Sequence, residues 1–168
     1  SDEEDCSIED PGLFTTPEWQ SGSLYQNYDP TTSHLNTACN FPASNDLDYL
    51  WDPEVYYDQF IALKGNPGAV IFAAIAGVPR NEDTDADCEG LGDEIGDCLG
   101  SDEMQLEENL YEHPEAPGQF FYGFSPACQR VDPDTGDDIT TARPGRRYVN
   151  LAEKFGGNSY MYSICNED

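Results

Sequence analysis

The sequence predicts an α/β fold built on parallel strands. Two stretches, residues 52–76 and 144–165, share one order: an amphipathic helical segment, a glycine-containing turn and a strand-like run. Helices that alternate with strands in this way are typical of parallel sheets. The chain has 168 residues, of which 38% are hydrophobic and 12% aromatic, so it can bury a core despite its charge. We expect one domain over residues 1–168, with loop-rich insertions at about 7–50 and 80–142.

The first of these two units begins at Asp52-Pro53. Aspartate is a favoured N-cap, and proline suits the first position of a helix. Lys64-Gly65 is a good helix end. The apolar run from Ala69 to Ala76 follows a turn and predicts a strand covered on both faces. One face of the helix carries four apolar side chains, Val55, Tyr56, Phe60 and Leu63.

The second unit repeats this order. A helix is expected from Pro144 to Gly156-Gly157, followed by a strand over Ser159–Cys165. Between the two units, Ser101–Tyr111 predicts a short helix and Gln119–Phe124 an edge strand. The apolar face of the second helix has the spacing i, i+3, i+4, i+7 and consists of Tyr148, Leu151, Ala152 and Phe155.

The charge of the chain excludes several classes of partner. Seven Lys and Arg residues stand against 34 Asp and Glu residues, a formal net charge of −27. Phosphates repel such a chain, so we expect no nucleic acid and no anionic membrane surface as partner. No apolar stretch reaches the roughly 20 residues of a membrane span. These 168 residues show no signal-peptide pattern, and we expect a processed, exported region.

Six scattered cysteines favour disulfides and an oxidising compartment, because none forms a CxxC pair. Their connectivity is formally open. We favour Cys88–Cys98, which closes a short loop, then Cys128–Cys165 and Cys6–Cys39. His34 and His113 are the only histidines, and no nucleophile, zinc or phosphate-loop motif accompanies them. We therefore expect no catalytic residues and no enzyme activity.

Two acidic stretches are candidate calcium loops. The first, Asp83–Glu94, has the ligand spacing of an EF-hand loop, although Cys88 stands where the sharp turn needs glycine. Its candidate ligands are Asp83, Asp85, Asp87 and Glu94. The second is DPDTGDD, with Asp132, Asp134, Asp137 and Asp138. In both stretches the alternative is a solvated acidic turn.

Three segments resemble the later half of a von Willebrand factor A-like (VWA) domain of a bacterial exported branch. They are SDEEDCSIEDPGLF, the unit ending in IFAAIAGVP, and ARPGRRYVNLAEKFG followed by YSICNED. The resemblance implies a doubly wound, Rossmann-like parallel sheet with a metal-ion-dependent adhesion site at the carboxyl ends of its strands. The Ser1-Asp2 step matches the family's Ser/Thr-Asp step, so Asp2 would face a divalent cation, Mg²⁺ or Ca²⁺.

The resemblance also has a gap. The family's Asp-x-Ser-x-Ser metal loop occurs nowhere in this chain, so the first strands and the metal loop are expected to be missing from it. A protein partner or another copy of the chain would then complete the sheet.

The function that follows is a non-enzymatic exported protein, at the bacterial cell surface or secreted, that mediates adhesion or protein binding. The resemblance also implies a lipoprotein, as many members of the branch are. One alternative is a structural subunit of an extracellular assembly, such as a surface layer or filament, completed by neighbouring chains. A weaker alternative is a calcium-binding acidic domain.

Overall fold

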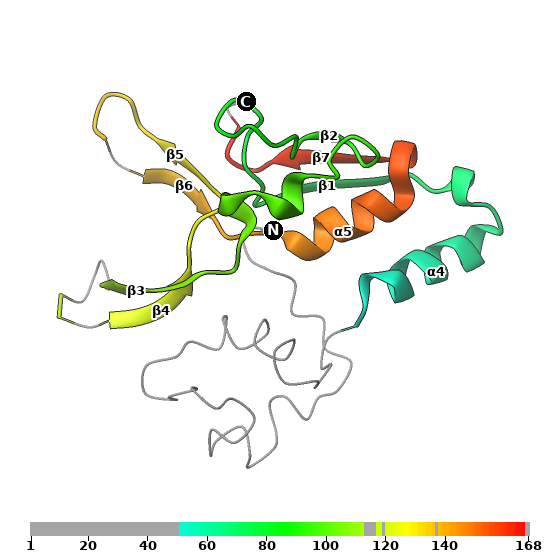
Figure 1. Ribbon diagram of the computed structural model, residues 1–168, viewed down its shortest axis with the longest axis horizontal. Coiled ribbons are helices and arrows are strands. Elements are labelled where there is room, and N and C mark those ends of the chain that lie inside the picture. Colours follow the sequence, from blue (N-terminus) through cyan, green and yellow to red (C-terminus); the bar gives the residue numbers. More distant parts are fainter. Residues whose placement is uncertain (1–50, 113–116, 119, 137, 167–168) are drawn as a thin grey trace, which may run out of the picture. The chain divides into compact units, whose positions relative to one another are not determined.

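The computed structural model describes residues 51–112, 117–118, 120–136 and 138–166. They form a mixed α/β fold, shown in Figure 1. Contacts between residues divide the chain into two units, which are considered separately. The larger unit contains Asp52–Gln105 and the described part of Ser125–Asp168, and the smaller contains the described part of Leu106–Phe124.

Helix α4 spans Pro53–Lys64, the bounds that its sequence predicts. The Asp52 side chain accepts a hydrogen bond from the Glu54 amide at 2.7 Å. At the other end, Gly65 takes the left-handed conformation with φ 67°, which glycine adopts without strain. The four apolar side chains of its predicted face are half-buried or exposed: α4 has no buried residue, and Leu63 is 80% exposed.

Three strands form the main sheet of the larger unit. They are β1 (Phe72–Ala76), β7 (Ser159–Ser163) and β2 (Gly90–Leu91), in the order β1-β7-β2. β1 and β7 are parallel, as the two repeated units predict, and β2 joins β7 antiparallel. The sheet is therefore mixed.

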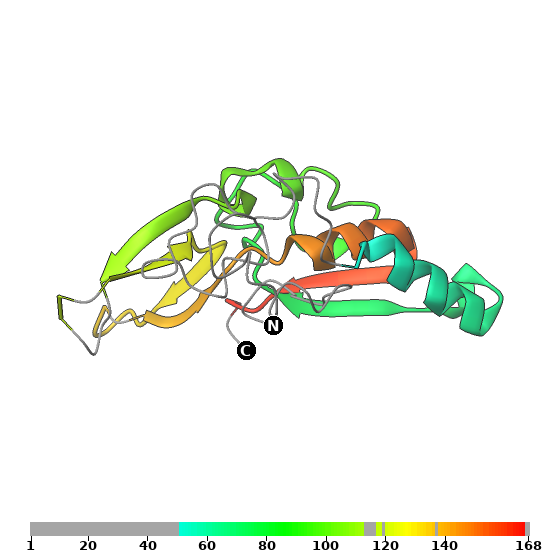
Figure 2. The ribbon, with the colours of Figure 1, turned by 90° about the horizontal axis from the view of Figure 1, so that it is seen from below.

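Helix α5 spans Arg146–Phe155 and covers one face of this sheet. It begins after Gly145, slightly later than the predicted start at Pro144. Figure 2 shows α4 and α5 on the same side of β1 and β7. The ring of Phe155 stacks on the ring of Phe72 in β1, with 5.7 Å between the ring centroids, and lies edge-on to Tyr57 of α4, with 4.9 Å between the centroids. One aromatic side chain therefore joins both helices to the sheet.

The prediction that the first strand is covered on both faces is wrong. Burial alternates along β1: Phe72 and Ala74 are half-buried and Ala76 is buried, whereas Ala73 and Ile75 are exposed. The reason is that α5 packs against one face of the sheet and α4 packs on α5 from the same side. The uninterrupted apolar run gives no sign of this alternation, because its outward side chains are also apolar.

The acidic stretch 80–142 contains short strands as well as loops. In the larger unit, β5 (Cys128–Val131) pairs antiparallel with β6 (Asp138–Ala142). In the smaller unit, β3 (Glu108–Glu112) pairs antiparallel with β4 (Phe120–Phe124). The strand predicted over Gln119–Phe124 is therefore present in its described part.

The helix predicted over Ser101–Tyr111 is wrong. Asp102–Met104 forms a single 3-10 turn, and β3 follows. The side-chain amide of Gln105 donates to the Leu99 and Ser101 carbonyls at 3.1 and 2.9 Å. These bonds stabilise the turn locally, while the Met104 side chain enters the core.

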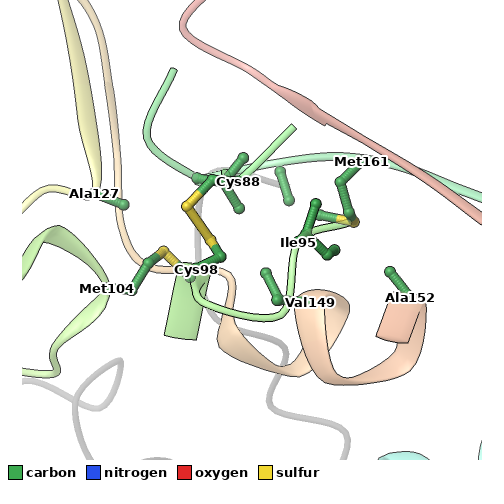
Figure 3. Packing of buried hydrophobic residues seen from close by; sticks show 10 residues of the cluster. Cys88, Ile95, Cys98, Met104, Ala127, Val149, Ala152 and Met161 are labelled. Atoms are coloured by element: carbon green, nitrogen blue, oxygen red, sulfur yellow. A yellow bond between two sulfur atoms is a disulfide. The ribbon is translucent and has the colours of Figure 1, made fainter. Parts of the chain in front are cut away.

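The core lies between α5 and the sheet and includes a disulfide (Figure 3). Cys88 and Cys98 are fully buried in it and are bonded to each other. A second disulfide, Cys128–Cys165, joins β5 to the chain beyond β7. Both are pairs predicted from the sequence, and Cys6–Cys39 lies outside the described residues. The core residues are Ala76, Val78, Cys88, Ile95, Cys98, Met104, Ala127, Val149, Ala152 and Met161.

Gly92 gives a test of this packing. A Cβ at this position would lie 2.1 Å from both the Ala152 carbonyl oxygen and the Ser159 Oγ. Gly92→Ala should therefore lower the free energy of unfolding by about 3 kcal/mol. Gly96→Ala is the matched control, because nothing lies within 4 Å of its added methyl group. Denaturant titration measures both, and equal losses would contradict the close approach.

Candidate functional site

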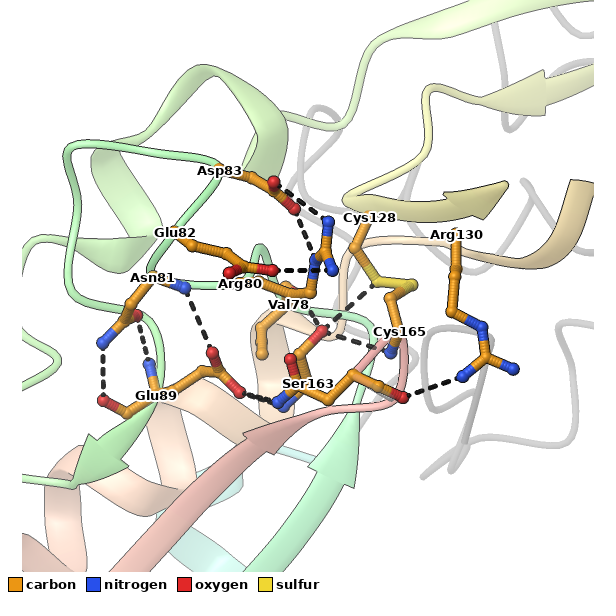
Figure 4. A network of polar contacts seen from close by, with 11 residues as sticks. Val78, Arg80, Asn81, Glu82, Asp83, Glu89, Cys128, Arg130, Ser163 and Cys165 are labelled. Atoms are coloured by element: carbon orange, nitrogen blue, oxygen red, sulfur yellow. Dashed lines mark hydrogen bonds and ion pairs between the residues drawn. A yellow bond between two sulfur atoms is a disulfide. The ribbon is translucent and has the colours of Figure 1, made fainter. Parts of the chain in front are cut away.

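The carboxyl ends of β1 and β7 lie at one edge of the sheet because the two strands are parallel. Open α/β sheets generally place their ligands at this edge. The chain leaves β1 through Gly77–Arg80 and leaves β7 through Ile164–Asn166. Figure 4 shows the polar network that joins these two exits.

Glu89 lies at the centre of this network. Its carboxylate accepts hydrogen bonds from the Ser163 amide at 2.9 Å, from the Asn81 amide at 3.1 Å and from the Asn166 side chain. Asn81 holds Glu89 in turn, since its Oδ1 accepts from the Cys88 and Glu89 amides at 2.8 and 2.9 Å. The loop over residues 81–89 is thereby fixed to the end of β7.

The buried hydroxyl of Ser163 links the two strand exits. It donates to the Val78 carbonyl at 2.6 Å and accepts from the Cys165 amide at 3.3 Å. Beyond it, Arg130 of β5 donates to the Asn166 carbonyl at 3.1 Å. The edge is thus an ordered polar structure.

An open cavity of about 550 Å³ borders this network. It is lined by Arg80, Glu82, Glu89, Tyr162 and Asn166. The Arg80 guanidinium pairs with Glu82 at 2.8 Å and with both carboxylate oxygens of Asp83, at 2.6 and 3.0 Å. The two carboxylates outweigh the one guanidinium, so this end of the sheet has acidic character.

The structure separates the ligands of the predicted calcium loop. Asp83 and Asp85 both line a second open cavity of about 540 Å³, and Asp83 also pairs with Arg80. Asp87 and Glu94 are exposed and do not line that cavity. Turns flank the loop, and Cys88 within it is disulfide-bonded. Among the described residues, no group of three or more His, Cys, Asp or Glu side chains is arranged to hold a metal ion.

The acidic stretch at Asp132 forms a turn between β5 and β6. The Asp132 carboxylate accepts from the amides of Asp134 and Thr135 at 2.8 and 3.2 Å, and Gly136 has φ 76°. Asp138 begins β6 and accepts a hydrogen bond from the Gln129 side chain. Asp2, Asp137, His34 and His113 lie outside the described residues.

A second surface lies on the side of the sheet opposite the helices. We define the outer sheet face as Ala73, Ile75, Leu91, Tyr160 and Tyr162. The register pairs Ala73 with Tyr160, Ile75 with Tyr162 and Leu91 with Tyr160, so these side chains project from the same face. Ile75 is 61% exposed, Tyr160 48%, Tyr162 41% and Leu91 38%. Tyr162 also lines the cavity at the carboxyl edge, so the two surfaces are continuous.

Sequence reasoning missed both surfaces. For the outer sheet face a signal exists in SYMYS, where Tyr160 and Tyr162 alternate with the buried Ser159, Met161 and Ser163. For the network no signal exists, because Glu89 is one of many acidic residues in its loop and its partner Ser163 is 74 residues away.

The Glu89 network predicts a measurable loss of stability. Glu89→Gln replaces one accepting oxygen by an NH₂ group, which would face a backbone N–H donor. We expect the free energy of unfolding to fall by about 2 kcal/mol. Glu82→Gln removes the same charge from a side chain that is 70% exposed, and should change stability by about 0.5 kcal/mol or less. Denaturant titration of both variants decides, and a Glu89→Gln loss as small as the control's would contradict the network.

Neither described α-helix has the length and apolar character needed to cross a bilayer. Searches of family models, curated proteins and solved structures returned no significant match to this chain.

Proposed function

We propose that this chain is a non-enzymatic binding module of an exported protein, at the cell surface or secreted, and that it holds a protein partner through the outer sheet face. The observation that carries the proposal is the exposure of Ile75, Tyr160 and Tyr162 side by side on a regular sheet. Contiguous exposed apolar patches typically mark interaction sites. Tyrosine is enriched in protein interfaces, since it combines a large apolar ring with a polar end.

The disulfides support the exported part of this proposal. Cys88–Cys98 is fully buried in the core. Cys128–Cys165 fixes the segment after β7, which belongs to the Glu89 network. Structural disulfides of this kind indicate an oxidising environment, as outside the cytosol.

The resemblance to VWA domains is part of the proposal. In a doubly wound sheet, helices cover both faces. Here α5 covers one face with α4 packed on it from the same side, and the outer sheet face stands where a second layer would pack. Adhesion through a divalent cation held by Asp2 is the variant that the resemblance implies. Binding through the outer sheet face does not depend on a cation, because the face is apolar.

Assembly into a surface layer or filament would cover the same face with another copy of the chain. The formal net charge of −27 opposes this, since two such chains repel each other unless salt screens them. A partner of different composition is therefore favoured.

Site-specific photocrosslinking tests the proposal. A photoreactive phenylalanine analogue replaces Tyr160 in the full chain, expressed in the organism that exports it. The matched control carries the analogue at Ile139 of β6, which is 49% exposed and lies off the face. We expect a discrete protein adduct from position 160 and none from position 139, with and without a metal chelator. The same adducts from both positions, or none from either, would overturn the proposal.

A further inference from the structure

We infer that the outer sheet face binds a basic amphipathic helix of the protein partner. This inference rests on the proposed binding function and specifies the chemistry of what is bound. Three features support it: the dimensions of the face, its side chains and the charges at its two ends.

The face has the dimensions of one helix. Where β2 lies beside β7, at Tyr160 and Met161, three strands span two spacings of about 4.8 Å, or about 10 Å in width; at Tyr162 the face consists of β1 and β7. An α-helix with its side chains is roughly 10–12 Å across. The five residues of β7 extend about 16 Å, which is the length of about three helical turns. A single short helix would therefore cover the outer sheet face.

The side chains of the face suit the apolar stripe of such a helix. Tyr160 and Tyr162 lie on the central strand, with Ile75 on one side and Leu91 on the other. Apolar residues spaced i, i+3, i+4 and i+7 on a helix would pack along this row. The exposed tyrosine rings can also receive Lys or Arg side chains by cation–π contact.

Carboxylates lie at both ends of the face. At the carboxyl end of β7, Glu82 and Glu89 line the cavity that Tyr162 borders. At the opposite end, Asp93 follows Leu91 by two residues and is exposed, and its carboxylate lies close to Gly157, just before β7. Arg80 also lines the cavity, but Glu82 and Asp83 pair with it.

The charge of the whole chain points the same way. A formal net charge of −27 attracts a basic segment and repels an acidic one, including a second copy of this chain. The bound helix should therefore carry Lys or Arg residues beside its apolar stripe.

Synthetic peptides test this inference with the intact chain. The first is a Lys–Leu peptide of about five helical turns, with all its leucines on one helical face. The second has the same composition in scrambled order, so charge is kept and the stripe is lost. The third replaces each lysine by glutamate. We expect saturable binding of the first peptide by fluorescence anisotropy, at least about tenfold tighter than either control and weakened by salt.

Variants then locate the site. Tyr160→Ser with Tyr162→Ser should weaken binding of the Lys–Leu peptide by about tenfold or more. Ile139→Ser on β6 should leave it unchanged. Far-UV circular dichroism checks that the variants are folded, and backbone NMR of the unaltered chain gives a second measurement. Amide shifts on adding the peptide should concentrate in β1, β7 and β2 and spare β6.

Three outcomes overturn the inference. They are equal binding of the ordered and scrambled peptides, shifts confined to the acidic loops, and a dimer of the chain that disappears in the double tyrosine variant. If the crosslink at position 160 forms and the Lys–Leu peptide does not bind, the helix inference fails and the binding function stands. If neither is observed, both fail.

Discussion

The central strand β7 is anchored at both ends by buried serine hydroxyls, and the larger unit depends on this. At its start, Ser159 Oγ donates to the Ala152 carbonyl at 2.6 Å, at the end of α5. At its end, Ser163 Oγ donates to the Val78 carbonyl at 2.6 Å, beyond β1. Both serines are buried on the core side of β7, with Met161 between them along the strand. Buried hydroxyls need partners, so these two bonds fix the position of β7 against both α5 and β1.

Much of this fold is readable from sequence where local chemistry decides it. The bounds of α4 follow from Asp52, Pro53 and Gly65, which act within one turn of the helix ends. The sequence-based predictions fail where contacts between residues far apart in the chain determine the local structure. The segment after Ser101 has good helix formers, but Arg146 of α5 donates to the Leu99 and Met104 carbonyls at 3.1 and 2.6 Å. Those contacts bind the turn to a helix more than 40 residues away.

The candidate surfaces were less predictable than the fold. The spacing of the acidic side chains suggests metal ligands. In the structure Asp83 pairs with Arg80, and Asp132 accepts hydrogen bonds within a turn. Glu89 has no local feature that separates it from its neighbours, and its role comes from Ser163 and Asn166. The outer sheet face was hidden for a different reason. Ile75 is apolar and exposed, so hydrophobic periodicity assigns it to a core that the fold does not build there.

The outer sheet face and the acidity of the chain act together physically. An exposed apolar face on a regular sheet favours self-association, which a large charge of one sign opposes. Here Glu82 and Glu89 line the cavity that Tyr162 borders, and Asp93 lies beyond Leu91 at the other end of the face. The same carboxylates attract a basic partner as it approaches. Affinity would then come from the apolar row, and selectivity from the charges around it.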